Sequence, residues 1–286
     1  NAATNSLSVQ VKNSLVNEWI VNNSLSDGSE STTLYAKVVC SGDKCGENYY
    51  KTANSNTVQW SLKVNSKIVP ELWYMVGNCV GSNDWDNGSG SIGTGLIPLL
   101  PIPDPEYDVN GRGTLVYAGY FPAGGQFKFI KNPGSWDEQM NYTNLRGESI
   151  VTDEDGNNHN IGIPEDGYYK IEMNTVNRTF TMVKLDGTYP EYTTITMPGD
   201  YQGWDPSVNA MTAMGKRDNT ENHEWYLDAT YDTKTELKFA NGTWDVNWGA
   251  ATFPFGYGSQ GGSNIPVRAG EYRVYFNDIL ETFSFF

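Results

Sequence analysis

In this sequence, two sets of tryptophan and lysine residues have the types and the spacing that molecular recognition requires. The first set is Trp85, Lys128 and Trp136, and the second is Trp204, Lys238 and Trp244, with Trp248 nearby. An indole ring offers a flat apolar surface that can cover the C–H groups on the face of a sugar ring. A lysine ammonium has three donors and no acceptor, which suits the hydroxyl oxygens on the rim of that ring. The residue types therefore favour two binding sites for a neutral glycan, one for each set.

Each of these residues also has a purely structural interpretation. A tryptophan is more often a core residue than a ligand platform, and a lysine within a strand often does no more than solvate one face of a sheet. Here Trp136 and Trp244 follow glycine-containing turns, where exposure is expected. Trp85 and Trp204 lie in polar, glycine-rich stretches. Each lysine alternates with apolar neighbours, so it points outward if those neighbours face the core.

Catalytic motifs give no comparable signal. The sequence contains no Gly-x-Ser-x-Gly elbow, phosphate-binding loop or His-Glu-x-x-His stretch. A glycosidase needs two carboxylates facing each other across a sugar, and Asp137 and Asp245 occupy matching places without indicating such a pair. The acidic stretch 153–158 has its glycine fourth rather than sixth and so fails the calcium-loop pattern. We expect a protein that is not an enzyme, with an extracellular glycoside hydrolase, or an accessory fragment of one, as the alternative.

The charge balance restricts the partners. The 286 residues include 34 acidic and 19 basic side chains, which give a formal net charge of -15. This balance argues against nucleic acid and against anionic membrane surfaces. The longest apolar stretch is far shorter than the roughly 18 residues that a membrane helix needs, and no charged segment followed by an apolar one opens the chain. We expect a soluble chain whose export signal or anchor is removed or absent.

Cysteine and histidine residues give little sign of a metal site. A zinc site needs about four such ligands at short spacings. His159 and His223 lie far from the three cysteines in the sequence, and we expect neither a metal nor another cofactor. Cys40 and Cys45 bracket a turn and could close a disulfide in an oxidising compartment. Cys79 lies in an apolar run and is expected to be a small buried side chain.

The elements that must position the two sets occur twice in the same order. In each copy a strand that contains the lysine is followed by a glycine-containing turn and then by Trp-Asp. The lysine-containing strands are Gln126–Ile130 and Glu236–Ala240. The other matching landmarks are Val76-Gly77-Asn78 with Pro198-Gly199-Asp200, Asn160–Ile163 with Asn264–Val267, and Thr179–Val183 with Thr282–Phe285. Matching landmarks in one order indicate two copies of one domain.

The fold class expected from these patterns is all-β. Apolar and polar residues alternate over short stretches, and turns containing many of the 30 glycines and 13 prolines separate them. Each copy is therefore typical of a β-sandwich. The predicted domains are an N-terminal immunoglobulin-like domain, complete or truncated, over residues 1–68, and two tandem carbohydrate-binding β-sandwiches over residues 69–187 and 188–286. The clearest strands expected in the first domain are Leu34–Cys40 and Val58–Val64.

The first copy contains an insertion from Gly95 to Pro105 that is rich in proline and leucine. Proline cannot donate a hydrogen bond to a neighbouring strand, so this proline density argues against a central strand. We expect a surface loop or, as the alternative, an exposed apolar contact for another protein.

These motifs resemble the SusE/SusF-like outer-membrane glycan-binding lipoproteins of Bacteroidetes polysaccharide-utilisation systems. The resemblance spans nearly the whole chain and rests on the order and duplication of short motifs. They are Val76-Gly77-Asn78 with Trp85-Asp86, Gly199-Asp200 with Gly203-Trp204-Asp205, Phe127-Lys128-Phe129 with Trp136, Leu237-Lys238-Phe239 with Trp244, and Asn264–Val267 with Gly270-Glu271-Tyr272. The succession of Trp, Phe-Lys-Phe and Trp is also similar to starch-binding modules of amylolytic enzymes.

The resemblance implies a non-catalytic lipoprotein on the extracellular face of the outer membrane, which captures starch or another α-glucan for a Sus-like uptake system. It implies binding through an aromatic arc with a lysine, and contacts with other outer-membrane proteins of that system. No cysteine stands at the start of this sequence, so the lipid anchor is implied by the resemblance alone. The lysine precedes the second tryptophan by eight residues in the first set and by six in the second, so the two sites need not have equal shape. A surface adhesin or assembly subunit with degenerate sugar sites is the structural alternative.

Overall fold

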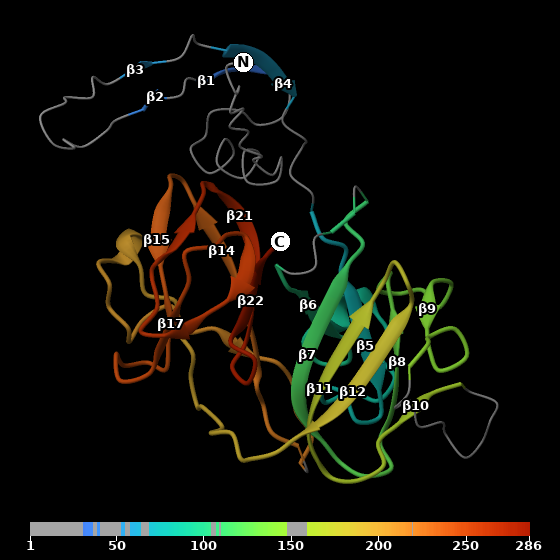
Figure 1. Ribbon diagram of the computed structural model, residues 1–286. Coiled ribbons are helices and arrows are strands. Elements are labelled where there is room, and N and C mark those ends of the chain that lie inside the picture. The colour runs from blue at the N-terminus through green and yellow to red at the C-terminus, as the bar shows by residue number, and fades with distance from the viewer. Residues whose placement is uncertain are drawn as a thin grey trace, which may run out of the picture. The chain divides into compact units, whose positions relative to one another are not determined.

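The computed structural model divides the chain into two compact units, Asn1–Ile68 and Val69–Phe286 (Figure 1). The described residues are 31–36, 39–40, 53–54, 58–63 and 69–286, the last range without 104–106, 109, 148–158 and 219. Cys45, the side chain of Cys40 and the acidic stretch 153–158 lie outside the described part, so the pairing of the two cysteines stays open.

Two antiparallel strand pairs make up the described part of the first unit. β1 (Ser31–Ala36) pairs with β4 (Val58–Lys63) along its whole length. β2 (Val39–Cys40) pairs with β3 (Ala53–Asn54). The two strands expected from the sequence fall on β4 and on parts of β1 and β2, while the immunoglobulin-like topology stays a prediction.

The second unit has a first half, residues 69–187, and a second half, residues 188–286. The first half folds into two antiparallel layers that share one strand (Figure 1). The hydrogen-bonded order is β10-β8-β5-β6-β7-β11-β12, and β9 also pairs with β8. The strands are β5 (Trp73–Gly77), β6 (Ile97–Pro101), β7 (Thr114–Phe121), β8 (Gln126–Ile130), β9 (Gln139–Met140), β10 (Ile161–Gly162), β11 (Gly167–Asn174) and β12 (Thr179–Leu185).

The shared strand β6 corrects the expectation for the proline-rich insertion. Residues 97–99 pair with β5 and residues 100–101 pair with β7, so the chain passes from one layer to the other within this strand. All of the side chains of β6 are buried, so residues 97–101 form neither a surface loop nor an exposed apolar contact. Proline is tolerated because each position of β6 has a partner strand on one side only, and a missing N–H on the other side costs no ladder hydrogen bond.

The second half of this unit forms smaller antiparallel sheets. Their orders are β13-β14-β21-β22-β18, β15-β20 and β16-β17-β19. The strands are β13 (Thr212–Ala213), β14 (Glu224–Tyr231), β15 (Thr235–Leu237), β16 (Phe239–Ala240), β17 (Asn247–Gly249), β18 (Phe255–Tyr257), β19 (Ser259–Gln260), β20 (Ile265–Val267), β21 (Gly270–Asn277) and β22 (Thr282–Phe285). Here too the chain changes its pairing partner within a few residues. Ala210 forms an isolated bridge with Thr196, whereas β13, which begins at Thr212, pairs with β14.

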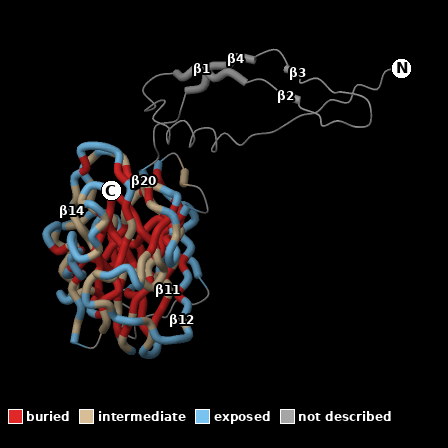
Figure 2. Tube along the Cα trace, turned by 90° about the vertical axis from the view of Figure 1, so that its left-hand side faces the viewer, coloured by how far each residue is buried: buried red, intermediate tan, exposed pale blue. Residues whose placement is uncertain are grey.

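Two large apolar cores and a smaller cluster lie within the described part of the second unit, and Figure 2 shows the buried segments gathered in its interior. The smaller cluster consists of Tyr74, Val76, Leu96 and Ile130, and Trp85 packs against it. The second core consists of residues from the second half alone. The first core takes most of its residues from the first half but also buries Met214 and Tyr275, and Tyr226 and Phe286 pack against it. The two halves therefore share packed apolar surface, which explains why they form one compact unit.

The described residues confirm the all-β fold class. Their only helical turns are η1 (Ser89–Ser91) and η2 (Asp200–Gln202), of three residues each. None of the helices within the described ranges is long and apolar enough to cross a membrane. Cys79 is buried as expected, and its burial raises the pKa of the thiol to about 12.

Candidate functional site

The first set of tryptophan and lysine residues comes together on the face of β8 that points away from the core. Lys128 lies between the fully buried Phe127 and Phe129, so strand alternation directs it outward. Its Nζ atom lies 5.7 Å from the ring centroid of Trp85 and 5.9 Å from that of Trp136, within the range of a cation–π contact with both rings. Trp136 is 40% exposed and Trp85 is half-buried. These residues, Trp85, Lys128 and Trp136, form the first platform.

The second set meets through a direct contact between its two indoles. The ring centroids of Trp204 and Trp244 lie 6.3 Å apart, with 38° between the ring planes. Trp244 is 41% exposed. Lys238 lies in the break between β15 and β16, and its Nζ atom donates to Asn247 Oδ1 at 3.4 Å. Trp204, Lys238 and Trp244 form the second platform.

Trp248 does not join the second platform, which corrects the expectation that it does. Its side chain is only 3% exposed and belongs to the second core. The indole packs against Phe276 and edge-on against Tyr192, and its Nε1 atom donates to Glu281 Oε1 at 3.0 Å. Its neighbours come from distant parts of the chain, so their presence could not be read from the local sequence around Trp248.

Both loop tryptophans adopt the left-handed backbone conformation, with φ of 52° for Trp85 and 63° for Trp204. This conformation is costly for a bulky side chain, by about 1–3 kcal/mol, and such strain is concentrated at functional sites. The amide of Trp85 donates to the carbonyl of Gly77 at 3.3 Å, and the amide of Trp204 donates to that of Gly199 at 3.0 Å. The same local conformation therefore presents one indole in each half.

Each of the two glycines that accept these hydrogen bonds lies where two chain segments approach each other too closely for a side chain. A Cβ atom on Gly77 would lie 2.1 Å from the carbonyl oxygen of Gln126, and one on Gly199 would lie 2.5 Å from that of Glu236. Both distances are far below any real contact of a Cβ atom. The absence of a side chain thus lets the tryptophan loop lie against the strand that carries the lysine.

The residue after each glycine joins the same loop to the lysine strand. Asn78 Oδ1 accepts from the amide of Gln126 at 2.7 Å, and Asp200 Oδ2 accepts from the amide of Glu236 at 3.2 Å. The other oxygen of Asp200 accepts from Trp204 Nε1 at 2.8 Å, which fixes the orientation of this indole. The sequence marked Asn78 and Asp200 only as landmarks of the repeat, and the structure gives them this positioning role.

Two further side chains lie near the platforms, and the sequence patterns did not single them out. Gln126 and Glu236 lie two positions before the lysines, so they project from the same face. Asn160 Nδ2 donates to Gln126 Oε1 at 3.0 Å, and Asn264 Nδ2 donates to Glu236 Oε2 at 2.8 Å. The Asn-Ile pair that recurs in both halves was the available signal, because it places an asparagine beside the lysine strand.

The exposed tryptophans are tethered through their backbone carbonyls. Gln139 Nε2 donates to the carbonyl of Trp136 at 2.9 Å, and Asn247 Nδ2 donates to that of Trp244 at 3.1 Å. Each donor lies three residues after its tryptophan, in β9 or β17. The turns are therefore held in place while the indole rings stay open to solvent.

The described carboxylates that stand out by sequence or by burial lie in exposed turns or in the interior. Asp137 and Asp245 are exposed, and each has its backbone amide bonded to a nearby hydroxyl in a turn. Burial raises the pKa of Glu224 well above its ordinary range, but this residue is only 2% exposed and accepts a hydrogen bond from Asn277. Across the described ranges, no group of three or more His, Cys, Asp and Glu residues could hold a metal ion.

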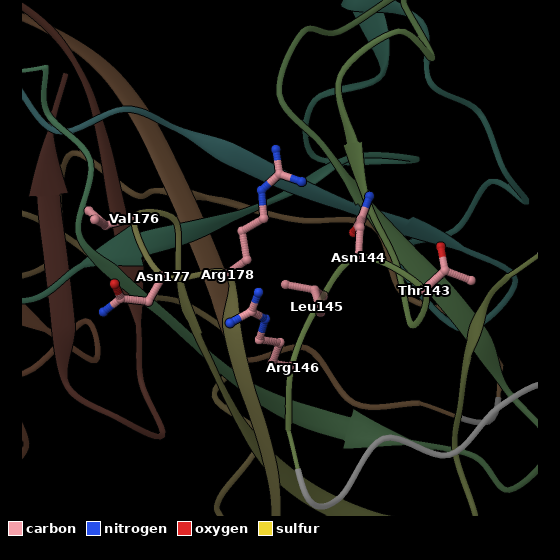
Figure 3. Close-up of a pocket in the computed structure, with 7 residues that line it drawn as sticks. All are labelled: Thr143, Asn144, Leu145, Arg146, Val176, Asn177 and Arg178. Atoms are coloured by element: carbon pink, nitrogen blue, oxygen red, sulfur yellow. The ribbon is translucent and has the colours of Figure 1, made fainter.

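An open pocket of about 520 Å³ lies on the first half of the second unit, apart from both platforms (Figure 3). Its lining residues are Thr143, Asn144, Leu145, Arg146, Val176, Asn177 and Arg178. Figure 3 shows the guanidinium groups of Arg146 and Arg178 lying apart rather than converging on one point. The pocket contains no residue of either platform.

Comparisons with known proteins give a distant likeness to solved structures. No protein-family model matches the chain, and no curated protein matches it. Among solved structures, the chain is similar to SusF from Bacteroides thetaiotaomicron, with a TM-score of 0.35 and 14% sequence identity. The similarity covers 86% of this chain and 57% of the SusF chain, so it spans little more than half of that protein. Membership of the SusE/SusF-like family stays a proposal.

Proposed function

We propose that this protein is a non-catalytic polysaccharide-binding protein with one glycan site in each half of its second unit. The observation that carries the proposal is the shared arrangement of the two platforms. In each half, two tryptophans from separate loops lie beside the strand region that carries the lysine, and one of the two indoles is about two-fifths exposed. Exposed indoles held by tethered backbone offer the faces that sugar rings cover, and the lysine supplies hydrogen-bond donors.

The class of glycan that fits best is neutral, with starch or another α-glucan as the leading candidate. The net charge of -15 disfavours polyanionic chains by long-range repulsion. The 38° tilt between the indoles of Trp204 and Trp244 suits a curved chain better than a flat ribbon, because a flat ribbon would lie best on coplanar rings. α-Glucans curve in this way, and the motif resemblance points to the same sugar.

The cellular placement that we propose rests on the resemblance. The protein would be held by an N-terminal lipid on the extracellular face of the outer membrane, where it would capture glycan beside other proteins of a Sus-like uptake system. Protease treatment of intact cells that produce the full-length protein tests this placement. Digestion of the protein without lysis is the expected result, and full protection would contradict surface display.

Affinity electrophoresis of the whole chain against a panel of neutral and acidic polysaccharides tests the function. We expect retardation by soluble starch and other α-glucans, and no retardation by acidic polymers. A reducing-sugar assay on soluble starch runs alongside, with turnover no greater than the buffer background. Turnover would favour the glycoside hydrolase, and a lack of retardation by every glycan would favour the adhesin or assembly subunit.

A further inference from the structure

The loop that carries Trp85 is held by an arginine from the other half of the second unit. Arg217 follows β13 in the second half, and its guanidinium forms an ion pair with Asp84, the residue directly before Trp85. One nitrogen of the same group also lies 3.5 Å from the carbonyl oxygen of Gly77 and 3.4 Å from that of Val80. A single side chain thus contacts the loop at three points.

The segment around Arg217 is itself fixed against the first half. Met214 is buried in the first core, and the amide of Gly215 donates to the carbonyl of Gly93. A Cβ atom on Gly215 would lie 2.3 Å from Ser82 Oγ, so the two chains approach each other closely at this point. The side chain of Arg217 is only 18% exposed. Asp84 is 63% exposed, so solvent screens the ion pair, and the partial burial of the guanidinium strengthens chiefly its contacts with the two backbone carbonyls.

These contacts bear directly on the conformation of Trp85. The carbonyl oxygen of Gly77 accepts hydrogen bonds from the amide of Trp85 and from the guanidinium of Arg217. Trp85 has the strained left-handed conformation, which persists only where the surroundings hold it. Trp204, by contrast, has its indole bonded to Asp200 in its own half. The two platforms therefore differ in what holds their loop tryptophan.

We propose that Arg217 is a positioning residue for the first platform, so that the glycan site of the first half is complete only when the second half is packed against it. The inference rests on the proposed function for its binding consequence. It adds that the sites are not two independent modules, since one half supplies the support for the other half's tryptophan loop.

The binding test compares Arg217→Met in two backgrounds of the full chain. Trp244→Ala leaves only the first platform, and Trp136→Ala leaves only the second. With soluble starch as the probe, we expect Arg217→Met to weaken binding about fivefold or more in the Trp244→Ala background, and to leave it unchanged in the other. Arg273→Met is the matched control, because it also breaks an arginine–aspartate pair in the second half, with Asp228. It should leave both backgrounds unchanged.

A measurement without ligand separates this inference from the proposed function. The indole N–H resonances of Trp85 and Trp204 are assigned from spectra of Trp85→Phe and Trp204→Phe. In Arg217→Met the Trp85 resonance should move or broaden, while that of Trp204 stays in place. Equal changes at both resonances with a lower unfolding midpoint, or no change at Trp85, would overturn the positioning role. If the parent chains do not bind starch but the Trp85 resonance moves alone, the α-glucan proposal fails and the positioning role stands.

Discussion

At the scale of single residues, the two platforms place the same residue types in different contacts. In the first, the Lys128 ammonium lies within cation–π range of both rings and joins them. In the second, Trp204 and Trp244 contact each other directly, and the lysine donates to Asn247. The second platform therefore presents a continuous aromatic surface, whereas the first presents two surfaces joined by a cation.

The neighbouring residues Trp244 and Trp248 should respond oppositely to truncation. Trp248→Ala leaves a cavity in the second core and should lower the free energy of unfolding by about 3–5 kcal/mol. Trp244→Ala removes a partly exposed ring and its contact with Trp204, and should lower it by only about 1 kcal/mol. Chemical denaturation of the two variants measures both values. A large loss for Trp244→Ala would show that this residue is structural and would remove it from the platform.

The sequence allowed part of the site to be predicted at this scale. Alternation around Lys128 predicted its outward direction, because a strand residue between two buried phenylalanines has no other face. Trp248 was assigned wrongly because Phe276 and Tyr192, which bury it, are distant in sequence. The left-handed conformation of Trp85 and Trp204 had no sequence signal, since glycine is the residue expected there.

At the scale of elements, the passage of one strand between two layers shapes the first half. β6 pairs first with β5 and then with β7, and it thereby closes the core between the layers. The alternation of Thr179–Val183 predicted a strand where β12 lies, but it did not identify β11 as the pairing partner. The rule that excludes proline from central strands was misleading for β6, because it assumes partners on both sides at every position. The sequence does not show on which side each partner lies.

Leu99→Ala tests this reassignment of the insertion. Leu99 is fully buried and pairs opposite Trp73, so its truncation should lower the free energy of unfolding by about 2–5 kcal/mol. The same change in a surface loop would cost no more than about 0.5 kcal/mol. Val183→Ala, at an exposed position of β12, is the control for loss of an apolar side chain without burial. Equal, small losses for both variants would contradict a central β6.

At the scale of the whole second unit, buried polar groups join the two halves. His223 has a fully buried side chain, and its Nδ1 atom lies 2.7 Å from Asp278 Oδ1 while its Nε2 atom lies 3.3 Å from Glu221 Oε2. Tyr168, from the first half, donates to the same carboxylate of Glu221. Asn277 donates to the carbonyl of Ala118 across the halves at 2.7 Å. No local pattern in the sequence predicted this interface.

The stability of this interface should depend on the protonation of His223. Burial alone disfavours the imidazolium, but the hydrogen bonds and negative charges of Asp278 and Glu221 outweigh it and raise the pKa of His223 above its ordinary value. A raised folded pKa stabilises the native state below the unfolded value of about 6.5, and this stabilisation is lost as the pH rises through the folded value. The difference in unfolding free energy between wild type and His223→Gln should therefore be largest below pH ~6 and decline above pH ~6.5.

Denaturant titrations of both proteins across this range measure that difference. Burial also raises the pKa of Glu224, so this residue likewise lowers stability as the pH rises, but it acts equally in both proteins and cancels. A difference that grows with rising pH would mean that the neutral imidazole, not the imidazolium, is the form that the interface favours.

Two platforms within one compact unit should bind long chains by avidity. After the first platform engages a polymer, the second meets it at an effective concentration of order mM. Wild type should therefore bind soluble starch more tightly than Trp136→Ala or Trp244→Ala. Maltotriose engages one platform at a time, so its affinity per site should not be higher in the wild type than in these variants. Calorimetry on the full-length variants measures this, and comparable affinities of all three for the polymer would mean that the platforms act independently.

The central claim, that the two platforms are the glycan sites, is tested most directly by titrating the double variant Trp136→Ala/Trp244→Ala with maltoheptaose. Tyr257→Ala, which truncates another exposed aromatic residue, is the control. We predict that the double variant stays folded, with a cooperative unfolding transition, and gives no binding heat, while the control binds as the wild type does. Wild-type binding by the double variant would place the glycan sites elsewhere on the protein.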